Sequence, residues 1–395
     1  MHCEEKYRDL YGRDPEAIAF CPMRIAPLGA HIDHQLGAIN ALALDRGIRI
    51  AYGTKHNGVV EVQSLQFPGK RAQFHVNSVE EKKVGDFADH LRGATKELGE
   101  KYPLRYGISA VIEGQLPIGG LSSSAAVIIA FLSAVASVNG IRLDPWEAIM
   151  MAKAAENNYV GVNCGKLDQC AEVLSRKDQL LYLDCSDDSY TTIPWTGKAF
   201  SIAIFFSGLE RSLASSAYNL RQDECKAAAY SLLAFAGLPY GKFGDAVLRD
   251  VPRQVFDQHK DKLPEPFRRR ATHFFTEFER TQKGIEAWKK GDIEAYGRLV
   301  FESGYSSVHN YECGCPELIS IYEIMTETDG IYGGRFSGAG FKGCCMALVD
   351  PAKAEDVLRK VEERYLKIYP NLQGKYLGIL CSSADGVDLS GGMRR

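Results

Sequence analysis

The chain has 395 residues, 47 Lys and Arg against 50 Asp and Glu, and a formal net charge of −3. This length exceeds what one ordinary hydrophobic core organises, so we predict two domains. The balanced charge excludes a global attraction to nucleic acid or to an anionic membrane surface, and we expect a small-molecule partner.

The cysteines and the N-terminal residues indicate a protein of the cytoplasm. The first ten residues, MHCEEKYRDL, are charged where a secretory signal would be apolar, and the apolar stretches elsewhere are short and interrupted. Eleven cysteines in so long a chain, several of them adjacent or nearly so, are typical of reduced, buried thiols. No pair of Cys-x-x-Cys motifs occurs at zinc-finger spacing, so we expect no zinc site. The oligomeric state stays open, with a monomer as the expectation.

The first half of the chain is predicted to open with β-sheet. Stretches rich in β-branched and apolar residues, separated by turn residues, predict strands over 41–53, 58–67 and 106–117.

Two helices are predicted to follow these strands. The apolar run 121–140 predicts a long helix that ends at its final glycine. The next helix begins with Asp144 as its cap, Pro145 in its first turn and Glu147 completing an Asp-x-x-Glu box, and it is predicted to run to Gly161.

The polar, turn-rich segment 185–198 is predicted to link the two domains, which we place at 1–195 and 196–395. Helices and strands alternate in the second domain, without an internal repeat. The predicted strands cover 199–208, 344–350 and 375–383, and the predicted helices cover 219–237, 270–291 and 353–369. Both halves therefore indicate the α+β fold class.

Residues 116–127, LPIGGLSSSAAV, are the first candidate for chemistry. A strand that passes through Pro117, Gly119 and Gly120 into a helix opening with serines leaves backbone N–H groups unpaired at the positive end of the helix dipole. Such a helix start binds anions, and a serine hydroxyl can ligate Mg²⁺, so the segment suits a nucleoside triphosphate. It is not a Walker A loop, because the required lysine is missing. The alternative is an ordinary N-capped helix whose serines face solvent.

Residues 337–343, SGAGFKG, contain a Gly-x-Gly-x-x-Gly pattern. A dinucleotide-binding fingerprint must follow a strand and open a helix, whereas these glycines lead into a predicted strand. A dehydrogenase therefore remains only a weak alternative. A glycine-rich turn packed beside a ligand fits the pattern better.

Two polar segments carry the remaining candidates. In APLGAHIDH, residues 26–34, His31 and Asp33 taken alone indicate a solvated turn. In ENNYVGVNCGKLDQC, residues 156–170, Asp168 is expected in a glycine-flanked turn, where its carboxylate can be aimed at a neighbour. A lone aspartate in a loop is more often solvated or capping, so both segments gain meaning only in combination.

Together these segments resemble the GHMP small-molecule kinases, and within them the galactokinase branch. RIAPLGAHIDHQLGA is similar to its N-terminal signature, PIGGLSSSAA to its phosphate loop, VGVNCGKLDQ to its catalytic-aspartate segment, RFSGAGFKGCC to its C-terminal glycine motif, and GLERSLASSAYNLR to a fifth block. The resemblance spans residues 24–345. It implies two α+β domains with the active site in the cleft between them, and phosphorylation of a sugar hydroxyl by ATP with Mg²⁺.

The resemblance also implies roles for single residues. Asp168 corresponds to the aspartate near the anomeric hydroxyl of the sugar, and Arg24 to the arginine that partners this aspartate and the transferring phosphoryl group. Ser124 and Glu156 fall where the family binds Mg²⁺. The positions implied to bind ATP are Pro117, Gly119, Gly120, Leu121, Ser122, Ser123, Ser124, Gly338 and Gly340. Those implied to contact the sugar are His31, Asp33 and Tyr218.

The proposed roles agree with the physics of phosphoryl transfer. In a loose transition state the charge spreads over the phosphoryl oxygens, so catalysis is mostly positioning plus cations. Arg24 would lower the pKa of Asp168 and weaken it as an early base. Whether Asp168 acts as a base or as an electrostatic positioner therefore stays open.

One departure from the family points to the substrate. Galactokinases carry glutamate where this chain has Ala30, and that glutamate contacts the C6 hydroxyl of the sugar. A glutamate about 4 Å from a C6 carboxylate would repel it by roughly 4 kcal/mol at an effective dielectric constant of 20. The absence of this charge favours galacturonic acid phosphorylated at C1, and the motifs also resemble plant-type galacturonokinases. His31, charged or neutral, is a candidate partner for the carboxylate, and so is Lys342, which could equally bind phosphate or face solvent.

Other departures and alternatives remain. The phosphate loop is one residue shorter than the usual galactokinase form, and Lys166 replaces an apolar residue two places before Asp168. A kinase of galactose or another neutral hexose is the second hypothesis. A sugar sensor that binds ATP without turnover is the third, and the presence of Arg24, Ser124, Glu156 and Asp168 argues against it.

Overall fold

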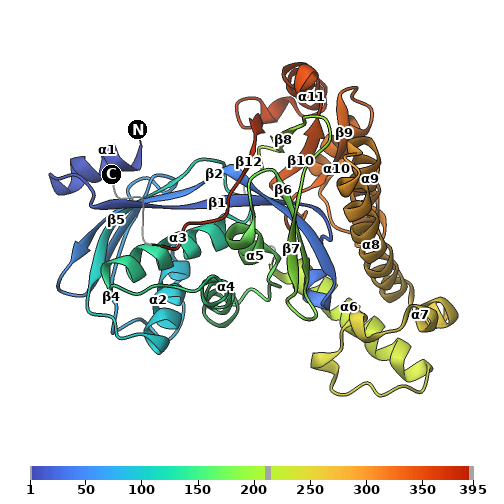
Figure 1. Ribbon diagram of the computed structural model, residues 1–395, viewed down its shortest axis with the longest axis horizontal. Coiled ribbons are helices and arrows are strands. Elements are labelled where there is room, and N and C mark those ends of the chain that lie inside the picture. The colour runs from blue at the N-terminus through green and yellow to red at the C-terminus, as the bar shows by residue number, and fades with distance from the viewer. Residues whose placement is uncertain (1, 210–214, 391–395) are drawn as a thin grey trace.

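The computed structural model describes residues 2–209 and 215–390, which form two β-sheets and the helices that cover them (Figure 1). This mixed arrangement of helix and sheet confirms the predicted α+β class.

The larger sheet has eight strands in the order β4-β3-β5-β2-β6-β7, with β1 and β12 also paired to β2. Its two longest strands are β1 (Ala17–Leu28) and β2 (Ala38–Lys55), which run along most of the molecule in Figure 1. The others are β3 (Val59–Ser64), β4 (Arg71–His75), β5 (Gly107–Gly114), β6 (Gln179–Asp184), β7 (Tyr190–Pro194) and β12 (Ser383–Ala384). The strands predicted in this half correspond to β2, β3 and β5.

Helices cover both faces of this sheet. One short helix, α1 (Cys3–Tyr11), packs through Cys3 and Tyr7 on Ala51 and Val111. The neighbours of these two strand residues point into the main core on the other face, as the alternation of a strand requires. That face carries α2 (Asp89–Lys101), α3 (Ser123–Val138), α4 (Pro145–Ala154) and α5 (Leu167–Leu174) (Figure 1).

The predicted start of α4 is confirmed in detail. The Asp144 carboxylate accepts the N–H of Trp146 at 2.8 Å, and the Glu147 carboxylate accepts the N–H of Asp144 at 3.2 Å. After α4 the helix continues as a π-helical turn, Ala155–Val160. This turn ends at Gly161, which has φ +83°. The helix therefore ends where the sequence predicted, although its last turn is wider than an α-helix.

The smaller sheet has the order β11-β8-β10-β9. Its strands are β8 (Ser201–Phe206), β9 (Ile331–Phe336), β10 (Cys344–Val349) and β11 (Leu377–Cys381). The helices of this half are α6 (Ser215–Phe235), α7 (Arg253–His259), α8 (Glu265–Lys289), α9 (Ile293–His309), α10 (Pro316–Thr326) and α11 (Ala354–Ile368). The predicted elements of the second half correspond to β8, α6, α8, β10, α11 and β11.

The predicted linker 185–198 is partly a strand, which corrects the expectation. Its residues 190–194 form β7, whose backbone pairs with β6 although its side chains are mostly polar and exposed. The composition of the segment suggested a loop because an edge strand buries little. The proposed division at 195/196 falls between β7 and β8.

The end of the chain returns to the larger sheet. Ser383 pairs with Leu44 in β2, and the N–H of Val387 donates to the carbonyl oxygen of Glu172 in α5 at 2.8 Å. In Figure 1 this red segment runs back along β2 toward the N-terminal half.

The smaller sheet joins two cores. In β8, Ile202, Ile204 and Phe206 belong to the core of the larger sheet, whereas Ala203 and Phe205 belong to a second core under α6, α10 and α11. Because both faces of the strand are buried, β8 reads as a continuous apolar run. The first core therefore extends without interruption from one half of the molecule into the other.

The eleven thiols are all free, and most are buried, as the sequence predicted. Within the described residues, none of the helices combines the length and the apolar character that a bilayer span needs.

Candidate active site

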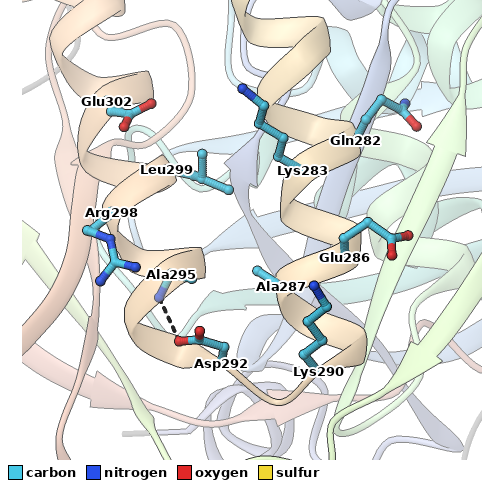
Figure 2. Close-up of a pocket in the computed structure, with 10 residues that line it drawn as sticks. All are labelled: Gln282, Lys283, Glu286, Ala287, Lys290, Asp292, Ala295, Arg298, Leu299 and Glu302. Carbon is cyan, nitrogen blue, oxygen red and sulfur yellow. Dashed lines mark hydrogen bonds between the residues drawn. The ribbon is translucent and has the colours of Figure 1, made fainter.

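Two hollows stand out on the described surface. Figure 2 shows one of about 510 Å³ between α8 and α9, near the turn that joins them. Charged side chains of both signs line it, and none of the candidate motif residues is among them. Its lining residues are Gln282, Lys283, Glu286, Ala287, Lys290, Asp292, Ala295, Arg298, Leu299 and Glu302. The other, of about 440 Å³, lies where the motifs meet, and we call it the cleft.

The cleft collects most of the candidate residues, although they come from distant parts of the chain. Those that line it are Arg24, Ala30, His31, Asp33, Gly120, Ser122, Ser123, Ser124, Glu156, Asp168, Tyr218, Gly338 and Lys342. Pro117, Gly119, Leu121 and Gly340 are not among the lining residues. The middle of the motif GLERSLASSAYNLR, residues 210–214, lies outside the described residues.

Arg24 and Asp168 form an ion pair at the centre of the cleft. Nε and Nη2 of Arg24 lie 2.8 and 2.6 Å from Oδ1 of Asp168, and Nη1 donates to the carbonyl oxygen of Gly120 at 3.0 Å. Arg24 is buried in β1, whereas the side chain of Asp168 is 29% exposed. One guanidinium group thus connects the carboxylate that faces the cleft with the glycine loop before α3.

Asp168 occupies the first turn of α5, which corrects its expected place in a turn. The sequence did not show this helix start, because Lys166 at the cap position supplies no side-chain cap. Lys166 forms an ion pair with Asp188 and is not among the residues that line the cleft. A helix fixes the direction of the Asp168 side chain better than a loop would.

The segment 117–124, which we call the phosphate loop, leads from β5 into α3, and this strand-to-helix connection is the one that the sequence predicted. Gly119 and Gly120 have φ of +132° and +88°, and Ser122 before α3 has φ +63°. No side chain caps the start of α3, so its first N–H groups remain available at the edge of the cleft. A helix of 16 residues directs its positive end here.

The glycine-rich turn 337–343 packs directly on the phosphate loop. A Cβ on Gly343 would lie 2.7 Å from the carbonyl carbon of Gly119, and one on Gly338 would lie 2.9 Å from Cα of Gly120. The Ser337 hydroxyl donates to the carbonyl oxygen of Gly120 at 2.6 Å. The turn leads into β10 and opens no helix, so the structural context of a dinucleotide fingerprint is missing. Its glycines allow two backbones to touch.

Residues 29–33, which we call the sugar loop, connect β1 to a single 3₁₀ turn. Gly29 and His31 have φ of +87° and +64°. The Asp33 carboxylate accepts the N–H of Leu167 at 3.4 Å, and a Cβ on Gly165 would lie 2.0 Å from Asp33 Oδ2. Burial, and next the charge of Asp168, raise the pKa of Asp33 to about 6. The loop thus places a second carboxyl group beside Asp168.

His31 lies among aromatic and sulfur groups at the base of the cleft. Its ring stacks on Tyr311 with the centroids 4.3 Å apart, and its Nε2 lies 3.4 Å from Sγ of Cys313. Burial and then the charge of Arg335 hold the pKa of His31 well below its usual range, so the ring is neutral. Of the two possibilities open from the sequence, the structure supports the uncharged imidazole. Tyr311 and Cys313, in the segment NYECG at residues 310–314, were not predicted as site residues.

Two further residues of α5 were missed by the sequence analysis. Nε2 of Gln169 donates to the Glu156 carboxylate at 2.6 Å, and Sγ of Cys164 lies 3.5 Å from the same oxygen. Glu172, one turn after Asp168, is fully buried, and burial followed by the charge of Asp168 raises its pKa well above the usual range. Gln169 is the last residue of the motif VGVNCGKLDQ but received no role from it, and Glu172 lies outside every motif.

The chain matches known protein families over most of its length. The description "GHMP kinases N terminal domain" matches residues 89–176, "GHMP kinases C terminal" matches 285–367, and "Galactokinase galactose-binding signature" matches 5–54. A galacturonokinase from Arabidopsis thaliana is 37% identical over 97% of this chain and 96% of its own length. A galactokinase from Roseiflexus is 31% identical over 97% and 95%, and the human galactokinase 29% identical over 91% and 90%.

Solved structures of related kinases have the same fold as this chain. The galactokinase of Lactococcus lactis, solved in complex with galactose, superposes with a TM-score of 0.88 at 26% identity and covers 98% of each chain. The mevalonate kinase of Methanococcus jannaschii shares the fold alone, with a TM-score of 0.67 at 16% identity over 94% of this chain and 100% of its own.

Proposed function

Because the chain belongs to the GHMP kinase family and is a sugar-1-kinase of the galactokinase and galacturonokinase type, we propose that its substrate is D-galacturonic acid. The reaction would transfer the γ-phosphoryl group of ATP to the anomeric hydroxyl and give galacturonate 1-phosphate and ADP. The eleven free thiols support the cytoplasm as its location.

The observation that supports a uronic acid as the substrate is the methyl side chain at position 30. Ala30 lines the cleft beside His31 and Asp33 and is 8% exposed. A carboxylate of the protein at this place would repel a C6 carboxylate by roughly 4 kcal/mol at an effective dielectric constant of 20, close to a thousandfold in affinity. An alanine removes this repulsion and leaves room for the second oxygen.

Groups that can receive the substrate carboxylate are present in the cleft. The neutral His31 would offer an N–H hydrogen bond without a charge. Lys342 lines the same cleft and would supply the positive charge.

The Arg24 and Asp168 pair supports phosphoryl transfer. Asp168 would orient the anomeric hydroxyl and accept its proton late, while Arg24 would face the charge that develops on the phosphoryl oxygens. Because Arg24 also donates to Gly120, it would keep this charge next to the phosphate loop. The N–H groups at the start of α3 would bind the phosphates of ATP.

Ser124 and Glu156 fit a magnesium ion. Both line the cleft, and a hydroxyl and a carboxylate oxygen are hard ligands of the kind that Mg²⁺ prefers. Gln169 holds the Glu156 carboxylate through its Nε2. When bound, the ion would neutralise charge on the phosphates of ATP.

A coupled assay of ADP release tests the proposal. Galacturonate and galactose are compared at several concentrations, and we expect the higher kcat/KM with galacturonate. A higher kcat/KM with galactose would replace the proposal by the neutral-hexose kinase. If none of the hexoses and hexuronic acids tested gives ADP release although ATP binds, the result would favour the sensor instead. Phosphorus–proton coupling to the anomeric proton of the product identifies the phosphorylated carbon.

A further inference from the structure

Two side chains of α8 hold the backbone of the sugar loop. Glu277 Oε1 accepts the N–H of Gly29 at 2.8 Å, and Nε2 of His273 lies 3.0 Å from the carbonyl oxygen of Ala30. His273 and Glu277 are one helical turn apart, so they share one face of α8. All four residues are buried. The contacts reach neighbouring backbone groups, and thus fix the path of the loop whatever its side chains are.

Glu277 is itself held by three donors. The Ser303 hydroxyl donates to Oε1 at 2.6 Å, Nε of Arg280 donates to Oε2 at 2.8 Å, and Nη1 of Arg335 lies 3.5 Å from Oε1. Burial alone would raise the pKa of Glu277, but Arg280 and Arg335 lower it to about 2. The carboxylate is therefore charged, and its bond to Gly29 is a charge-assisted one of the stronger kind.

His273 has only one possible arrangement of its protons. Burial lowers its pKa to about 4, so the ring is neutral and carries one N–H group. A carbonyl oxygen can only accept, which places the hydrogen on Nε2 toward Ala30. Nδ1 then accepts from the Ser306 hydroxyl of α9 at 2.9 Å. The Ala30 carbonyl thus fixes the tautomer, and the hydroxyl on α9 satisfies the remaining ring nitrogen.

The opposite side of the loop leaves no room for a shift. A Cβ on Gly29 would lie 2.6 Å from the carbonyl oxygen of Ala38. The backbone of Gly29 is thus pressed between β2 on one side and the α8 side chains on the other. Residue 30 is presented to the cleft from a fixed backbone.

We propose that His273 and Glu277 are positioning residues for sugar selectivity, because they hold the peptide groups before Gly29 and after Ala30 and so fix the backbone that places Ala30 in the cleft. This inference rests on the proposed function in one respect, namely that residue 30 faces the exocyclic carbon of the sugar. A buried cluster of polar groups on α8 and α9, far in sequence from the loop, provides this rigidity.

The test compares His273→Leu, which removes the donor at similar volume, with His273→Gln, whose amide restores a donor. We expect His273→Leu to raise the KM for the sugar about tenfold, equivalent to ~1.4 kcal/mol, and to shift the galacturonate-to-galactose ratio of kcat/KM at least ~threefold. The KM for ATP should stay within about twofold, and His273→Gln should recover most of the loss. Thr272→Val on the same helix, whose hydroxyl bonds only to its own helix at Arg268, should leave all values unchanged.

An unchanged sugar KM and ratio in folded His273→Leu would overturn the proposal, and so would equal increases in the KM for sugar and for ATP. If that variant does not fold, Ser306→Ala decides, because it removes the partner of Nδ1, together with the acceptor of the Asn310 amide at 3.0 Å. A smaller shift in the same direction is then expected, and the absence of any shift would overturn the proposal. If the parent enzyme prefers galactose, only the substrate assignment is wrong. The positioning role of His273 is then tested with galactose, whose KM must still rise in His273→Leu.

Discussion

Arg24 donates to Asp168 and to Gly120 at the same time, so a single guanidinium group sets the spacing between the proposed acceptor hydroxyl and the phosphate loop. At the scale of single residues, this pair and Ala30 separate two properties of the site. Arg24 and Asp168 bear on whether transfer occurs, and Ala30 bears on which sugar is accepted. The two properties can therefore be changed independently.

Replacing Asp168 tests the transfer step. We expect Asp168→Ala to lower kcat by about 10³-fold, the size of a general-base contribution, while calorimetry shows ATP binding within about threefold of the parent. Asp168→Asn keeps the shape but cannot accept a proton, so activity well above that of the alanine variant would identify a positioner. Asp223→Asn, at an exposed carboxylate on α6, should leave kcat unchanged. Parental activity in Asp168→Ala would contradict the assignment.

Replacing Ala30 tests the charge argument. We expect Ala30→Glu to lower the galacturonate-to-galactose ratio of kcat/KM by about a hundredfold or more, because the new carboxylate repels the uronic acid. Ala30→Gln adds the same volume without the charge and should lower the ratio less than about tenfold. Equal effects of both variants in the ADP-release assay would show that size, and not charge, controls selectivity.

At the scale of elements, the two glycine-rich segments act as one unit. The phosphate loop and the turn 337–343 come from different halves, yet Gly119 and Gly343 touch through their backbones. The position of the loop that would hold ATP is thus set by the end of β9 and the start of β10.

Adding a methyl group at this contact tests the coupling. Gly343 has φ +104° and its Cβ would lie 2.7 Å from the Gly119 carbonyl carbon, whereas Gly374 has φ +77° and no atom within 4 Å. Gly374→Ala should cost only backbone strain, about 1 kcal/mol, with an unchanged KM for ATP. Gly343→Ala should lose more stability and raise the KM for ATP several-fold. Identical behaviour of the two variants, in thermal unfolding and in kinetics, would refute the coupling.

Elements with local signals were predictable from the sequence. The β-branched runs of β2 and β3 and the capping residues Asp144 and Glu147 act within a few positions, and the structure has them as predicted. Single contacts across the fold were not predictable. His273 meets Ala30 across 243 positions, and nothing in the sequence of an amphipathic helix marks which buried residue will do so. The family resemblance included Gln169 in the motif VGVNCGKLDQ without giving it a role, and it did not reach Glu172.

At the scale of the whole molecule, a continuous core unites both halves, so buried charges in the cleft affect the stability of the entire chain. Asp33 and Glu277 are both buried carboxyl groups, but their pKa values move in opposite directions, to about 6 and about 2. Their contributions to folding must therefore depend on pH with opposite sign.

Asp33→Asn should stabilise the protein in a pH-dependent manner. The folded chain holds the Asp33 proton more tightly than the unfolded chain, so its contribution is fully present below about pH 4 and is lost as the pH rises to about 6. The neutral asparagine avoids this loss. Its advantage in the free energy of unfolding should grow over this window to at most ~3 kcal/mol and then stay constant.

Denaturant unfolding at several pH values measures this difference, with Glu277→Gln as the counterpart. The charge of Glu277 contributes above its unfolded pKa of about 4.3, so this variant should be destabilised at neutral pH and approach the parent as the pH falls toward 2. A difference between Asp33→Asn and the parent that does not vary from pH 4 to pH 6 would contradict the burial of an ionisable group there.

The return of β12 to the larger sheet gives the chain an unusual order of assembly. The backbone of α5 near Glu172 receives its hydrogen bond from Val387, which is synthesised long after this helix. Domains generally fold in the order of synthesis, but here the helix that carries Asp168 gains this contact only after the whole smaller sheet has been synthesised. A nascent chain halted before this strand should bind nucleotide poorly, however complete its first sheet is, and cutting between residues 195 and 196 would yield two fragments of which neither is whole.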